Sequence, residues 1–209
     1  QDYQLLSSKD SANQKDFTNL KVGHVLVSNK KAYEFSQNSP SNFIGTTNFS
    51  GNIKDDVNYT FLKNQFFLEF NSKYVLGTFK AKSSIMSYSY GYDKIINQTS
   101  DINTRKLKGS AISFGADWKA KVSKFQLDAT GEITPGSARL AGTNLQGNLS
   151  YKKDSLFDIK ASVLLNSKSP NFNYLLHQSI YDAYNWKNDF ENIRTQNLGF
   201  QIDSRWLNA

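Results

Sequence analysis

The strongest constraint on the fold is a two-residue alternation of apolar and polar side chains, clearest in FQLDATGEI, residues 125–133. Every odd-numbered position in this stretch is apolar or glycine, and every even-numbered position is polar, with two carboxylates among them. Successive side chains of a β-strand point to opposite faces. The stretch therefore predicts a strand with one apolar face and one polar face.

The same alternation recurs along the chain and predicts about eight strands, most of them about 9–12 residues long. Strands of soluble proteins are usually about 5–6 residues long, whereas a tilted strand needs about 9–11 residues to cross a bilayer. No helix is convincing, and the best candidate, around residues 174–180, is short. The further strand stretches are residues 62–70, 75–85, 112–121, 145–151, 157–166 and 197–206, with residues 20–35 also strand-like but of unclear phase.

The connections between these strands alternate between short and long. Tight turns are expected at residues 71–73, 121–124 and 152–155, long links at 37–60, 93–108 and 168–195, and a medium link at 134–140. Outer-membrane barrels have short turns on one side, long loops on the other, and strands that alternate apolar-out with polar-in. We therefore predict an all-β, antiparallel transmembrane β-barrel, formed by residues 1–209 as a single domain or as a segment of a larger barrel.

A soluble β-sandwich or lipocalin-like barrel is the alternative, because its strands alternate too. Two features favour the membrane. Glycine and alanine dilute the apolar rows, which lipid tolerates better than a close-packed core does. Aromatic residues also lie near the expected strand ends, as in the girdles of membrane barrels: Tyr74, Tyr88, Tyr90, Tyr92, Trp118, Phe125, Tyr151, Phe157 and Trp206.

Composition excludes several other classes. The net charge is +7, but the basic residues are scattered in runs of two at most, which argues against a nucleic-acid interface. The chain contains no cysteine, which excludes disulfides and thiolate metal sites, and His24 and His177 are its only histidines. No stretch of about 20 apolar residues predicts a transmembrane helix. The chain starts with Gln1 and lacks a signal peptide, so we expect a mature form or a piece of a longer protein.

No catalytic constellation is visible in the sequence. There is no G-x-S-x-G motif, no glycine-rich phosphate loop and no calcium-binding loop motif. Asp128 and Glu132 share a strand face but lie about 13 Å apart along the strand, too far for the carboxylate pair of a glycosidase. We therefore expect neither an enzyme nor a bound cofactor or metal.

The polar rows of the expected strands carry six basic and six acidic residues. They are the candidate pore-lining residues: Lys63, Lys80, Lys82, Lys119, Lys160 and Arg205, with Glu69, Asp117, Asp128, Glu132, Asp158 and Asp203. Cross-strand ion pairs between them would fill a narrow lumen, whereas a wide lumen would keep the charges hydrated. Because the numbers balance, the net charge predicts no anion selectivity.

The link at residues 168–195 is unusually aromatic. So much aromatic surface is rarely left in solvent, so we expect this link to fold inward as a constriction or to dock a partner. Its candidate residues are Phe172, Tyr174, Tyr184, Trp186 and Phe190, with Tyr181 in the same link.

The C-terminal stretch, residues 169–207, resembles the Bacteroidota outer-membrane family called "putative porins". The matching features are PNFN at 170–173, YNW at 184–186 and TQNL at 195–198, and residues 20–38 and 49–70 are also similar to family segments. The resemblance implies an outer-membrane β-barrel of a Gram-negative bacterium. Family members are longer than this chain, which ends in WLNA rather than on an aromatic residue, so an internal piece of a longer protein is expected.

The function implied is passive diffusion of small polar solutes through a water-filled lumen. The partners would be outer-membrane lipid and the solutes themselves. One alternative is a non-conducting barrel that serves as scaffold or subunit of an outer-membrane assembly, with other membrane proteins as partners. The other is a soluble β-sandwich binding module.

Overall fold

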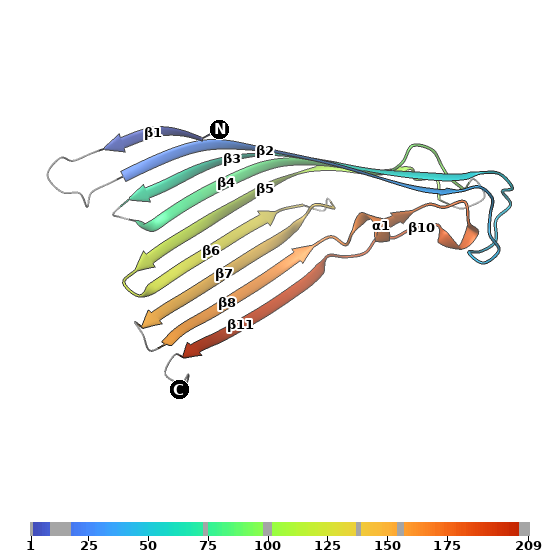
Figure 1. Ribbon diagram of the computed structural model, residues 1–209. Coiled ribbons are helices and arrows are strands. Elements are labelled where there is room, and N and C mark those ends of the chain that lie inside the picture. The colour runs from blue at the N-terminus through green and yellow to red at the C-terminus, as the bar shows by residue number, and fades with distance from the viewer. Residues whose placement is uncertain are drawn as a thin grey trace.

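The structure, a computed structural model, describes residues 2–8, 18–72, 75–97, 102–136, 139–153 and 157–204. Most of these residues form one large antiparallel sheet, in which consecutive strands pair with each other up to residue 168 and residues 193–204 add the last strand beside residues 157–168. Figure 1 shows the sheet curling from β2 round to β11. Its strands are β1 (Asp2–Ser8), β2 (Thr18–Gln37), β3 (Ile53–Ser72), β4 (Val75–Tyr92), β5 (Lys106–Val122), β6 (Phe125–Thr134), β7 (Gly142–Lys153), β8 (Phe157–Lys168) and β11 (Ile193–Ser204).

The all-β, antiparallel prediction is confirmed, and the described sheet is open, because β1 and β11 lie at its two edges and do not pair with each other. The sheet has one strand more than the eight expected. That strand is β1, whose sequence DYQLLSS does not alternate. Its register against β2 shifts between Gln4 and Leu6, and such an irregularity breaks the two-residue period that sequence reasoning depends on.

The first long strands are longer than predicted. β2 and β3 have 20 residues each, β4 has 18 and β5 has 17, whereas β6, β7, β8 and β11 have 10 to 12. As a result, one end of β2–β5 projects well beyond the other strands (Figure 1). We call this part the distal extension and define it as residues 28–37, 53–61, 86–92 and 106–111.

The two faces of the sheet follow from its register. We call the face that carries Lys80 and Asp117 the front face, and the face that carries Phe79 and Phe114 the back face. In the register of the sheet Lys80 lies opposite Asp117, and the register of β4 against β5 continues without a shift to Gly91. Even-numbered residues of β4 therefore stay on the front face from Lys80 to Tyr92.

Within the distal extension the polarity of the two faces is exchanged. The front row of β4 changes from Lys80, Lys82 and Ser84 to four large side chains that are at most 9% exposed. The back face becomes polar over the same region, where β2 carries Lys30 and Glu34 and β5 carries Lys106 and Lys108. The four large front-face residues are Met86, Tyr88, Tyr90 and Tyr92.

This exchange corrects one expectation. Tyr88, Tyr90 and Tyr92 were expected among the girdle aromatics near strand ends, but they lie nearly buried on the front face. They are covered by residues 169–192, which we call the covering segment. It contains α1 (Phe172–Leu175), β9 (Leu176–His177), η1 (Asp182–Tyr184) and β10 (Trp186–Lys187), and it lies beside the distal extension in Figure 1.

The covering segment supplies part of a hydrophobic core. Leu176 is fully buried, and it forms a cluster with the buried side chains of Tyr90, Tyr92 and Ile96. No convincing helix is expected from the sequence, and the best candidate stretch, residues 174–180, is not helical beyond Leu175: the one-turn helix α1 covers residues 172–175 and strand β9 follows it. Within the described residues, this core therefore lies between the distal extension and the covering segment. The two contributing parts are about 80 residues apart in the chain.

Candidate functional site: an ion-paired front face and its covering segment

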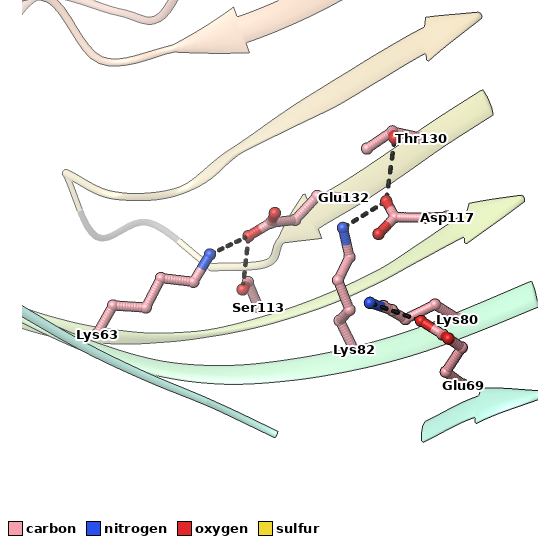
Figure 2. Close-up of polar contacts among 8 residues, drawn as sticks. All are labelled: Lys63, Glu69, Lys80, Lys82, Ser113, Asp117, Thr130 and Glu132. Atoms are coloured by element: carbon pink, nitrogen blue, oxygen red, sulfur yellow. Dashed lines mark hydrogen bonds and ion pairs between the residues drawn. The ribbon is translucent and has the colours of Figure 1, made fainter. Parts of the chain in front are cut away.

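The front face carries a set of ion pairs that joins four strands (Figure 2). Lys80 Nζ lies 2.8 Å from Glu69 Oε2, and Lys82 Nζ lies 2.6 Å from Asp117 Oδ1. Lys63 Nζ lies 3.3 Å from Glu132 Oε1, which places a lysine of β3 against a glutamate of β6. The charges of this part of the front face are therefore paired with one another rather than left free.

Hydroxyl groups and a further lysine complete these contacts. Thr130 Oγ1 donates to Asp117 at 3.0 Å, and Ser113 Oγ donates to Glu132 at 2.8 Å. Lys21 of β2 lies 3.4 Å from Glu69. Sequence reasoning missed Lys21 because the phase of residues 20–35 was unclear, yet its register partner is Glu69 itself.

The remaining candidate residues within the described part of the chain lie on the same face, but they do not join this set of ion pairs. Lys160 pairs with Asp203 at 3.4 Å, in a pair about half exposed. Asp128 accepts a hydrogen bond from Gln126 at 3.0 Å. Lys119 and Asp158 form no ion pair within the described part of the chain. Arg205 lies outside the described residues.

The back face, outside the distal extension, exposes a continuous band of large apolar side chains, which we call the apolar band. Leu198 is 85% exposed and Phe200 is 70% exposed. A contiguous apolar surface of this extent marks a site of contact with lipid or protein rather than with water. The band includes Leu26, Leu62, Phe66, Leu68, Phe79, Ile85, Ile112, Phe114, Trp118, Phe125, Ile133, Leu145, Leu149, Leu165, Leu198, Phe200 and Ile202.

The covering segment inserts one aromatic ring into the front face of the distal extension. The Phe172 ring lies 4.8 Å from the Tyr88 ring and 5.5 Å from the Tyr90 ring, stacked on both. It also lies 5.6 Å from the ring of Tyr59 on β3. Phe172 thus packs on this tyrosine row together with Leu176.

The other predicted aromatics of this segment lie elsewhere. Trp186 stacks on His177 at 4.5 Å, and its Nε1 donates a hydrogen bond to the Asn173 carbonyl. Both contacts lie within the covering segment, so they stabilise its internal structure. Tyr174, Tyr184 and Phe190 are between 42% and 57% exposed.

Buried polar side chains fasten the covering segment to the distal extension and its loops. Gln178 is 1% exposed; its Oε1 accepts from the backbone N–H of Ile96, and its Nε2 donates to the Thr104 carbonyl. Tyr181 Oη donates to Gln37 at 2.7 Å and accepts from the backbone N–H of Ser41 at 2.9 Å. Because buried polar groups are costly unless hydrogen-bonded, these matched partners favour one docked position of the segment.

Two titratable groups lie inside this contact. Burial raises the pKa of the Asp55 carboxyl, whose Oδ2 accepts a hydrogen bond from Ser179 Oγ at 3.3 Å. Burial lowers the pKa of His177, whose Nδ1 lies 3.2 Å from Tyr92 Oη. In both cases the low-dielectric surroundings disfavour the charged form.

The described residues hold no cluster of three or more metal-ligating side chains. No described helix has the length and apolar character needed to span a membrane.

Together these features define a class: an all-β protein built as an antiparallel meander of long amphipathic strands, apolar on one exposed face and ion-paired on the other. The family model described as "Putative porin" matches residues 1–209, and the chain belongs to that family. The family expected from the sequence is therefore confirmed. Porins are typically not enzymes, in agreement with the missing catalytic motifs. No curated protein and no solved structure matches the chain.

Proposed function

We propose that this chain forms part of a porin barrel in a bacterial outer membrane, through which small polar solutes diffuse passively. The observation that carries the proposal is the opposition of the two faces: an exposed apolar band on the back and paired charges on the front. A sheet that faces lipid needs the apolar band, and a water-filled lumen tolerates the paired charges. The front-face residues from Lys63 to Asp203, with Arg205, would line that lumen.

Strand direction supports a larger barrel. In a meander of nine described strands, the edge strands β1 and β11 run in the same direction. Closing the sheet by pairing these two strands would create a parallel pair, whereas bacterial outer-membrane barrels have an even number of antiparallel strands. We therefore propose that additional strands, odd in number, complete the barrel.

The distal extension would stand in water beyond the membrane. Its back face carries solvent-exposed ion pairs, Lys54 with Glu34 at 3.1 Å and Lys106 with Asp93 at 2.6 Å, where the apolar band has ended. The β4 row of its front face is apolar, and residues 169–192 cover that row. This arrangement would place the covering segment at the mouth of the lumen.

A non-conducting barrel that serves as scaffold or subunit of a membrane assembly is the second candidate. The ion pair of Lys63 with Glu132 supports it, because side chains that bridge three strand spacings occupy space that an open lumen would need. The exposed rings of Tyr174, Tyr184 and Phe190 could then contact another protein.

Single-channel recording separates the two candidates. The detergent-purified, full-length protein would be inserted into a planar bilayer, with insertion checked by protease protection. Discrete conductance steps are expected from an open pore, and their size bounds its width. A silent bilayer with confirmed insertion would refute passive diffusion and support the scaffold, whose partners would then be sought by co-purification.

A further inference from the structure

A cavity of about 930 Å³ lies between the front face of the distal extension and the covering segment. Pockets that bind small organic molecules have volumes of about 300–1,000 Å³ and are mostly apolar, with a few polar groups that orient the ligand. The cavity is lined from both sides, by strands β2–β4 and by residues 168–184. Its size and construction are therefore those of a binding site for a small molecule.

The walls of the cavity are rich in aromatic rings. Tyr33, Tyr59 and Tyr90 come from three neighbouring strands, and Tyr59 is the direct register partner of Tyr90. Phe172 of the covering segment packs on Tyr59 and Tyr90. Tyr33 is 66% exposed, so part of its surface is open to a ligand. An exposed ring of this kind favours a flat, ring-containing molecule that can stack on it.

The charges around the cavity are unequal. Three cations line it, Lys31, Arg139 and Lys168, against one carboxyl group, that of Asp55. Arg139 already pairs with Asp189, whereas Lys31 and Lys168 form no ion pair with any described residue. Asp55 is 7% exposed and accepts a hydrogen bond from Ser179, and it forms no ion pair with either lysine among the described residues. The lysines are thus available to a ligand.

We propose that this cavity binds small amphipathic anions, molecules with a flat ring body and one carboxylate or sulfonate group. The ring body would lie against the exposed ring of Tyr33, and the anionic group would meet Lys31 and Lys168. A neutral molecule of the same shape lacks the second contact, and a cation would be repelled by both lysines. The proposal goes beyond passive diffusion, since such a site would bind its ligand whether or not the barrel conducts.

Two probes with the same naphthalene ring test the proposal: naphthalene-2-sulfonate, which carries an anionic group, and the neutral 2-naphthol. Binding would be measured by isothermal titration calorimetry on the full-length protein in lipid nanodiscs, with empty nanodiscs subtracted. We expect the sulfonate to bind about tenfold more tightly than 2-naphthol at low salt, and the difference to shrink as salt screens the charges. Equal affinities, or binding no greater than to empty nanodiscs, would overturn the proposal.

Neighbouring lysines offer a matched control. Lys31 is on the front face of β2, whereas Lys30, the preceding residue, is on the back face, and both are exposed. We expect K31Q/K168Q to lose most of the preference for the sulfonate and K30Q to keep it, while Tyr33→Ala weakens both probes. If K30Q lost the preference for the sulfonate equally, that preference would come from general surface charge, and a defined site would be contradicted. Because binding is measured without current, a silent pore would leave this test intact.

Discussion

Lys63 of β3 forms an ion pair with Glu132 of β6 at 3.3 Å although two strands, β4 and β5, lie between them. Neighbouring strands are about 4.8 Å apart, so the two backbones would be about 14 Å apart in a flat sheet. The side chains reach across small neighbours on the same face, Ser84 and Ser113, which are 2% and 1% exposed. The contact therefore depends on extended side chains, small residues between them and the curvature of the sheet.

The Lys63–Glu132 pair is expected to stabilise the sheet measurably. The two side chains are 19% and 27% exposed, so water screens them less than a surface pair. A double-mutant cycle with K63M and E132Q should give a coupling free energy of about 1 kcal/mol in urea unfolding of the liposome-inserted protein. The same cycle on Lys160 and Asp203, 52% and 50% exposed, should give a clearly smaller coupling, because solvent screens that pair. Equal couplings would show that burial does not govern these pairs.

Phe172 is expected to hold the covering segment in place. Replacing Phe172 by alanine removes a ring that stacks on Tyr88 and Tyr90, and losing such a partly buried ring costs about 2–4 kcal/mol. Hydrogen exchange should show lower protection of residues 169–192, whereas β6–β8 keep theirs. Tyr174→Ala, in the same short helix but 57% exposed, is the control and should change protection little. Unchanged protection in F172A would mean that the hydrogen bonds of Gln178 and Tyr181 suffice.

Acidification should loosen the covering segment through His177 and tighten it through Asp55. Burial lowers the pKa of His177 below its ordinary value of 6.5, so its unfavourable contribution begins as pH falls below 6.5 and grows down to the lowered pKa. Burial raises the pKa of Asp55 above 3.8, so the cost of its buried charge is relieved as pH falls through the raised pKa. The two effects have opposite signs.

Single substitutions separate these two effects. Between pH 7 and 4, D55N should show only the loss of protection in residues 169–192, and H177F should show only the gain. Protection factors corrected for the intrinsic exchange rate at each pH are the measurement. The same pH response in both variants would contradict the assignment of opposite signs to the two groups.

Two glycines with positive φ are expected to respond differently to alanine. Gly77 has φ +84° and Gly136 has φ +104°, a backbone conformation that costs an L-residue about 1–2 kcal/mol at either position. A Cβ at Gly77 would lie 2.0 Å from the Lys119 carbonyl oxygen, whereas one at Gly136 would meet nothing within 4 Å. G77A should therefore lower the urea midpoint clearly more than G136A does. Equal midpoints would mean that β4 and β5 separate without cost at this point.

The sequence by itself determined where most of the strands lie and which residues share a face, because the two-residue period is local; it missed β1 and left the phase of β2 open. Residues 125–133 alternate without exception, and the structure pairs Phe125 to Thr134 in one unbroken register with β7. The same reasoning placed Lys80, Asp117 and Glu132 on one face, and the register of β4, β5 and β6 puts all three on the front face.

Only the tertiary structure decided what each face meets. The sequence shows that Tyr88, Tyr90 and Tyr92 share one face, because they alternate with Ser87, Ser89 and Gly91. It does not show that residues 169–192 cover this face. The partner of Lys63 was hidden in the same way, because Glu132 reaches it only through curvature across two strands. Alternation is set by neighbours in the chain, whereas these contacts join residues about 70 to 90 positions apart.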